Sequence, residues 1–97
     1  MATTSNTPTV DVKAAVRIAA AYFDQLIQRH YSDLAVEEVE KTDDDRFWLV
    51  TIGYNVVSTD RSPLAAFQDK LTSREYKIIK VDSQSGEALS MKVRKSF

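Results

Sequence analysis

The fold is decided by the stretch Tyr76–Arg94, YKIIKVDSQSGEALSMKVR. In both of its halves, apolar and charged residues alternate with a period of two, which is typical of β-strands with one buried face. Between the halves lies DSQSG, in which Asp, Ser and Gly favour a tight reversal of the chain. The pattern predicts a β-hairpin with strands over residues 75–82 and 87–94.

The pairing register of this hairpin has two solutions. With a four-residue loop, Asp82 pairs with Glu87, and one face carries Tyr76, Ile78, Leu89, Met91 and Val93, interrupted by Lys80. With a three-residue loop over 84–86, the shared face consists of Ile79, Val81, Leu89, Met91 and Val93. We favour the second solution because this face is uniformly apolar and Gly86 then takes a left-handed conformation in a bulge. A slip by one residue would exchange the two faces.

A helix is expected upstream, from Val10 to about His30. Apolar residues recur there at spacings of three and four and form one stripe, namely Val12, Val16, Ala19, Phe23, Leu26 and Ile27. The segment contains five alanines and neither proline nor glycine, which favours helix. Thr9 is expected to be the N-cap, with Asp11 in the first turn.

A short strand is expected over residues 34–41. Leu34 and Val36 lie on one face, and a β-bulge at Glu37-Glu38 would return Val39 to the same face. The three aspartates at 43–45 that follow are typical of a turn.

Residues 46–57 are expected to form a central strand, because both of its faces are partly apolar. One face carries Trp48, Val50, Ile52, Tyr54 and Val56. Gly53, on the other face, indicates a bulge, a bend or a close approach. Residues 58–74 form a long connection, in which Phe67 and Leu71 have the spacing of a short helix.

Together these elements predict the α+β class. A flexible tail over 1–9 precedes one domain over 10–97, in which an N-terminal helix packs on a four-stranded antiparallel sheet with its strands in chain order.

Residues 76–90 resemble the most recognisable segment of PepSY-type domains, which belong to the cystatin-like α+β group. That segment combines a tyrosine, alternating valines, an aspartate, a small turn, Gly-Glu and a valine-rich strand, and FWLVTIGY at 47–54 is similar to the strand before it. The resemblance implies one helix followed by an antiparallel sheet, often beside a peptidase. The chain lacks the Gln-x-Val-x-Gly loop of cystatin inhibitors and has a longer 58–74 connection, so protease inhibition is assigned to no residue.

No motif of catalysis or metal binding is present in the sequence, and we expect neither enzyme activity nor a cofactor. There is no cysteine, which excludes thiol nucleophiles and thiolate metal sites. His30 is the only histidine and has no partner at a catalytic spacing. The acidic residues Glu37, Glu38, Glu40 and 43–45 lack the glycine and the spacing of a calcium loop.

Charge weighs against a nucleic-acid partner. The net charge is −1, with five Lys/Arg and nine Asp/Glu in residues 1–50 and eight and five in residues 51–97. A basic hairpin face is formed by Lys77, Lys80, Lys92, Arg94 and Lys95. Tyr76 beside them could stack a base, but a single tyrosine offers little stacking surface for a single-stranded nucleic acid.

We therefore expect a small protein-binding or regulatory module, which would act on a protease or another enzyme. Its recognition residues would be Pro63, Leu64 and Phe67 of the long connection, together with Trp48. Two alternatives stay open, a small-ligand or enzymatic pocket on the concave face of a curved sheet, and a homodimer paired through a sheet edge. No signal or membrane segment is found in the sequence, so we expect a cytoplasmic protein without membrane contact.

Overall fold

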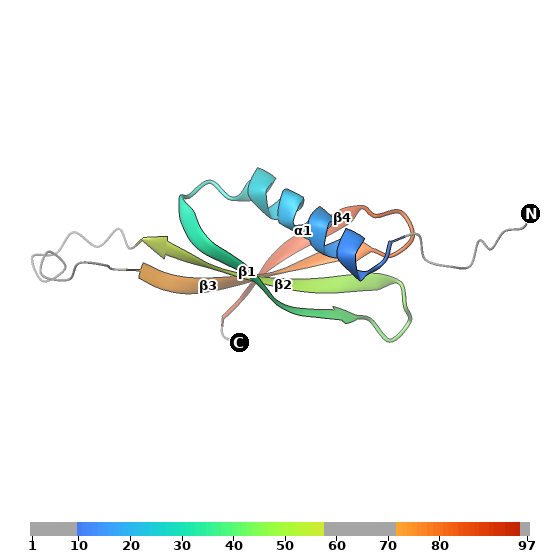
Figure 1. Cartoon of the computed structure of the whole chain (residues 1–97). Coiled ribbons are helices and arrows are strands. Elements are labelled where there is room, and N and C mark those ends of the chain that lie inside the picture. The colour runs from blue at the N-terminus through green and yellow to red at the C-terminus, as the bar shows by residue number, and fades with distance from the viewer. Residues whose placement is uncertain (1–9, 58–71, 96–97) are drawn as a thin grey trace, which may run out of the picture.

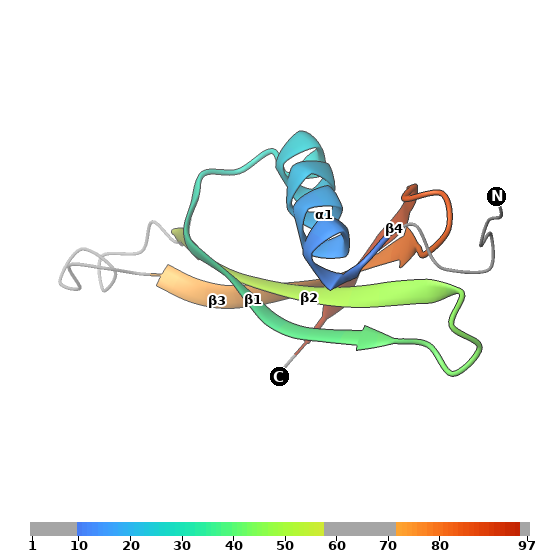
Figure 2. The same ribbon diagram turned by 45° about the vertical axis from the view of Figure 1, so that its right-hand side comes forward.

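The computed structural model describes residues 10–57 and 72–95. In these residues, helix α1 (Val12–Leu26) is followed by β1 (Tyr31–Lys41), β2 (Phe47–Val57), β3 (Thr72–Asp82) and β4 (Ala88–Arg94). The strands form one antiparallel sheet in the order β1-β2-β3-β4, and α1 lies across one face of it (Figure 1). Figure 2 shows α1 on one side of the twisted sheet. The predicted α+β architecture is confirmed.

Helix α1 buries only part of the predicted stripe. Its buried residues are Ala15, Ala19 and Phe23, which are four apart, while Val12 and Leu26 are exposed. Alanines at the contact let the helix approach the sheet closely, and this close packing decides which face is buried. The helix also begins later and ends earlier than predicted.

The N-cap of α1 is Asp11, and the prediction of Thr9 was wrong. The Asp11 side chain accepts a hydrogen bond from the backbone N–H of Ala14 at 2.8 Å. The helix ends where the backbone of Ile27 becomes extended, with its N–H still donating to the carbonyl of Phe23 at 2.9 Å.

The core lies between α1 and the predicted inner face of β2. Val50, Ile52, Tyr54 and Val56 are buried there, and Ile79 and Val81 of β3 continue this surface. The ring of Phe23 packs on Tyr54 at 4.8 Å and on Tyr31 at 5.1 Å between centroids. The alternation read in residues 46–57 and the central position of that strand are therefore confirmed.

Edge strand β1 contains the predicted bulge and a second one. The register shifts between Val36 and Glu38, and Val39 then pairs with Val50 and packs against the core, as expected. A further shift lies between Ser32 and Ala35, where Asp33 has a positive φ of 53°. This second bulge was not predicted.

The β3–β4 hairpin uses both candidate registers. At the turn, the Asp82 N–H donates to the Glu87 carbonyl at 2.8 Å, as in the four-residue loop. Further along, Ile79 pairs with Met91, as in the register with a three-residue loop. The shift between them leaves Leu89 as an extra residue, so the prediction of a three-residue loop was wrong at the turn. Gly86 is left-handed as predicted, with a φ of 77°.

Candidate functional site at the β3–β4 edge

The two edge strands of the sheet differ in regularity and charge. Strand β1 is interrupted by two bulges, which is one way in which proteins block edge pairing. Residues 31–46, which comprise β1 and its turn, contain seven Asp/Glu and two Lys/Arg. Strand β4 pairs regularly with β3 from Ser90 to Arg94, and residues 72–95 contain six Lys/Arg and three Asp/Glu. The β4 edge is therefore the regular and basic one.

Backbone groups of β4 face outward at two positions. The backbone N–H of Asp82 donates to the carbonyl of Glu87, toward β4. The N–H of Ser83 donates to the carbonyl of Arg46, on the side of β2. Because bonding alternates along an antiparallel strand, the even residues of β3 bond to β4, and their partners include Ser90 and Lys92. The N–H and C=O groups of Met91 and Val93 therefore point away from the sheet, toward the open edge.

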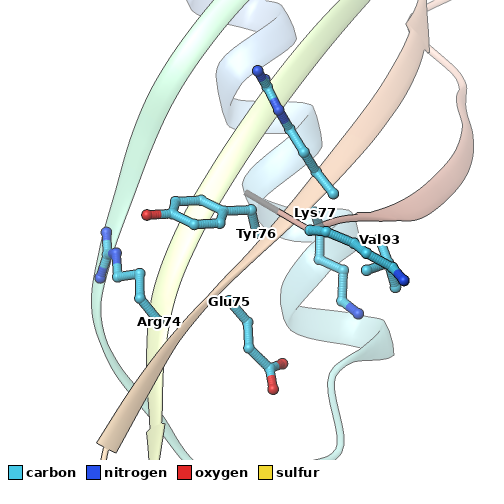
Figure 3. Close-up of a pocket in the computed structure, with 7 residues that line it drawn as sticks. Arg74, Glu75, Tyr76, Lys77 and Val93 are labelled. Carbon is cyan, nitrogen blue, oxygen red and sulfur yellow. The ribbon is translucent and has the colours of Figure 1, made fainter. Parts of the chain in front are cut away.

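A hollow of about 460 Å³ lies where β4 ends. Arg94 is the last residue of β4 and pairs with Tyr76, whereas β3 begins at Thr72, so β3 extends past the end of its neighbour. We call this the edge hollow; it is lined by Arg74, Glu75, Tyr76, Lys77, Val93, Arg94 and Lys95 (Figure 3). Four of these side chains are cationic and one is acidic.

Two of the four cations are bound to β1. Arg74 contacts the Glu37 carboxylate at 2.7 Å and donates to the carbonyl of Asp33 at 2.7 Å. The hydrogen bond with Glu37 raises the pKa of Arg74. Arg94 contacts Glu38 at 2.7 Å. These pairs span β2 and fix the acidic edge strand to the basic hairpin.

Gly53 of β2 has no side chain, which leaves room for the Arg74–Glu37 ion pair and the Tyr76 ring. Of the three readings of this glycine, the close approach is the one that the structure confirms. A Cβ atom at this position would lie 2.5 Å from Glu37 Oε2, 3.0 Å from Arg74 Nη2 and 3.0 Å from Tyr76 Cε1. In Figure 3, Tyr76 and Arg74 both extend toward β1. Any larger residue at position 53 would displace the ion pair or the ring.

Among the described residues that line the edge hollow, the single carboxylate is already bound. Glu75 accepts from the Tyr54 hydroxyl at 3.1 Å and pairs with Arg29 at 3.1 Å. Burial, followed by this hydrogen bond, raises the pKa of Tyr54 to about 12. Glu75 thus fastens the segment after α1 to the sheet.

Lys77 and Lys95 differ from the two arginines. Neither lysine forms an ion pair with a residue in the described part of the chain. Lys77 pairs across the strands with Val93, which is 67% exposed, and the two lie together in Figure 3. The hollow therefore offers cationic and apolar contacts side by side.

Of the predicted recognition residues, the structure places only Trp48. Its indole N–H donates to the carbonyl of Val10 at 3.0 Å, and Lys41 lies 4.8 Å from its ring centroid. Pro63, Leu64 and Phe67 lie outside the described residues. The prediction that the basic residues of the hairpin share one face was wrong for Lys77, which pairs with Val93 on the helix side, whereas Lys80, Lys92 and Arg94 lie on the opposite face. Lys77, Arg94 and Lys95 line the edge hollow, and Lys80 and Lys92 line a second one.

His30 is exposed beyond the end of α1. Within residues 10–57 and 72–95, no three His, Cys, Asp or Glu residues are placed to hold a metal ion. Over the same residues, no helix is long and apolar enough to cross a membrane.

No family model, curated protein or solved structure matches this chain. A helix followed by a four-stranded antiparallel sheet is consistent with cystatin-like α+β topology.

Proposed function

We propose that this protein is a non-enzymatic binding module that takes an extended segment of a partner protein as a fifth strand beside β4. The observation that carries the proposal is the outward-facing backbone of Met91 and Val93 on the regular edge of the sheet. Strand addition of this kind draws its affinity from main-chain hydrogen bonds and its specificity from alternate side chains.

Side chains beside this edge support strand addition. Met91 packs against the core and leaves part of its surface open, while Val93 is mostly exposed. An added strand would cover Val93 on the helix side of the sheet, and burial of apolar area favours association. Strand β1 carries bulges that block such pairing, whereas β4 pairs regularly as far as Arg94.

The arrangement favours a foreign partner over a symmetric dimer. Two β4 edges placed side by side would bring Lys92 and Lys95 of each copy together, and like charges on facing strands are destabilising. Two β1 edges placed side by side would likewise bring the glutamates of both copies together. The titratable groups of the edge hollow, with Glu75 bound to Tyr54 and Arg29, favour binding over catalysis.

The test is a selection of random eight-residue peptides displayed on phage against the full chain, with Val93→Pro as the counter-target. Proline at position 93 removes one outward N–H and leaves the β3–β4 bonds at residues 92 and 94 in place. Val93→Thr keeps the N–H and is the matched control. Thermal unfolding of both variants confirms that they fold.

The proposal expects enriched peptides that bind the wild type and Val93→Thr and lose at least tenfold in affinity on Val93→Pro. Peptides that bind all three proteins equally would place recognition elsewhere and refute strand addition at β4. A selection without enrichment would refute it as well.

A further inference from the structure

We infer that the segment bound by β4 alternates acidic and apolar residues, with its carboxylates on the sheet face opposite α1. This inference rests on the proposed function, because it assigns the chemistry of the strand that β4 would receive. It follows from the side chains that flank the open edge on each face of the sheet.

On the face opposite α1, the edge is cationic. Ser90, Lys92 and Arg94 of β4 lie on this face, and Ser90 pairs with Lys80 of β3. Lys80, Ser90 and Lys92 line an outer hollow of about 340 Å³ together with Thr42, Leu49 and Ile78. An added strand places every second side chain beside these residues, within reach of a cross-strand pair. A carboxylate is the complementary group there.

On the helix side, the β4 side chains at the edge are apolar, and Lys77 of β3 lies behind Val93. Met91 and Val93 lie on this side, and Met91 packs against the core. An added strand would place its remaining side chains beside these two residues. Apolar side chains fit, because a polar group covered there would lose water without a partner.

Most of the positive charge at this edge has no acidic partner among residues 10–57 and 72–95. Arg74 and Arg94 are paired with Glu37 and Glu38. The remaining cations of the hairpin are Lys77, Lys80, Lys92 and Lys95, and none of them forms an ion pair with a described residue. Two line the edge hollow and two line the outer hollow, so lysines flank the open edge on both faces.

A second copy of the chain fits this edge poorly, although its β1 strand is acidic. The bulges between Ser32 and Ala35 and between Val36 and Glu38 break the period of two that pairing with Ser90–Arg94 requires. In addition, Glu37 and Glu38 are already bound to arginines within their own sheet. The occupant is therefore a regular acidic strand from another protein.

Three labelled eight-residue peptides test the inference by fluorescence anisotropy at 50 mM NaCl. They alternate valine with glutamate, with glutamine or with lysine. We expect the glutamate peptide to bind roughly tenfold more tightly than the glutamine peptide, the sum of several cross-strand charge pairs, and the lysine peptide to bind most weakly. The advantage of glutamate should shrink at 500 mM NaCl, where exposed charges are screened.

Lys92→Glu should remove most of the preference for glutamate. Lys13→Glu is the matched control, since it makes the same charge change at an exposed residue of α1 that lines neither hollow, and it should leave the preference intact. Val93→Pro should weaken the binding of both the glutamate and the glutamine peptides.

Each failure has its own signature. Equal binding of the glutamate and glutamine peptides, lost in Val93→Pro, would refute the acidic partner and leave strand addition standing. A glutamate preference that survives in Val93→Pro would mean adhesion to surface charge and would refute both proposals. Salt-sensitive oligomers of the chain that Val93→Pro abolishes would assign the edge to a second copy and overturn the inference.

Discussion

Replacing Tyr54 with phenylalanine removes one buried hydroxyl and keeps the ring that packs on Phe23. Burial, helped by the hydrogen bond to Glu75, raises the pKa of Tyr54 from its ordinary value near 10 to about 12. The folded state therefore holds this proton more tightly than the unfolded state. Its contribution to stability is complete below pH 10 and is lost as the pH rises through 12. The whole effect is roughly 2.7 kcal/mol, of which about 1.4 kcal/mol is lost by pH 11.

Urea unfolding at pH 8 and at pH 11, followed by far-UV circular dichroism, measures this loss. Between the two pH values, the wild type should lose about 1.4 kcal/mol more unfolding free energy than Tyr54→Phe, because the variant has no hydroxyl to ionise there. At pH 8, Tyr54→Phe should be the less stable protein by about 1.5 kcal/mol, since it lacks the bond to a charged carboxylate. Glu75→Gln should keep most of the pH dependence, because burial is the larger cause.

Parallel losses in the wild type and Tyr54→Phe would refute the reasoning. They would show that water reaches the hydroxyl as readily in the folded state as in the unfolded state. The placement of Tyr54 at the centre of the core would then be wrong.

Three further substitutions test the fold, each by urea unfolding at pH 7. Gly53→Ala should destabilise by about 1–3 kcal/mol, because the new Cβ would meet Glu37 Oε2 at 2.5 Å and Tyr76 Cε1 at 3.0 Å; a neutral result would contradict the close approach. Phe23→Ala should lose about 3–5 kcal/mol, since its side chain is fully buried; a loss below about 1 kcal/mol would remove it from the core. Asp11→Ala should lose about 0.5–2 kcal/mol, largely recovered in Asp11→Ser, and equal stability of all three proteins would contradict the N-cap.

Strand β2 was predictable because a strong period of two covered its whole length, with apolar residues on both faces. The buried stripe of α1 was predictable only in part. The predicted stripe shares Ala19 and Phe23 with the buried one, but it contains Val12 and Val16 where the structure buries Ala15, because the sequence favours the larger residues. The choice depends on how closely the helix approaches the sheet, which is a property of the packed structure and not of the helix alone.

The hairpin register shows a similar conflict between local and distant effects. At the turn, the Asp82 carboxylate accepts from the N–H groups of Gln84 and Ser85 at 2.7 and 2.9 Å, which lowers its pKa and fixes the four-residue loop. Further along, packing of Ile79 and Met91 against α1 fixes the other register. Sequence patterns identified both possibilities but not the bulge that reconciles them.

The candidate site could be predicted only in part. Its basic residues were visible as a group on the hairpin. The edge hollow depends on the length by which β3 extends past β4, and the start of β3 at Thr72 is set by its pairing with Val57 of β2. Nothing in residues 72–74 alone predicts a strand, because they contain no apolar residue.

Leu89, the extra residue of the hairpin, lets the turn and the strand keep different registers. If the register of the turn continued through Leu89, this residue would pair with Lys80, and every later residue of β4 would move to the opposite face of the sheet. Met91 would then leave the core, and Lys92 would turn its charge toward α1. Deletion of Leu89 has no such effect, because Ser90 would follow Ala88 directly and would still pair with Lys80. The bulge therefore absorbs one residue of chain length between the turn and the strand, and the apolar and basic faces of β4 survive its loss.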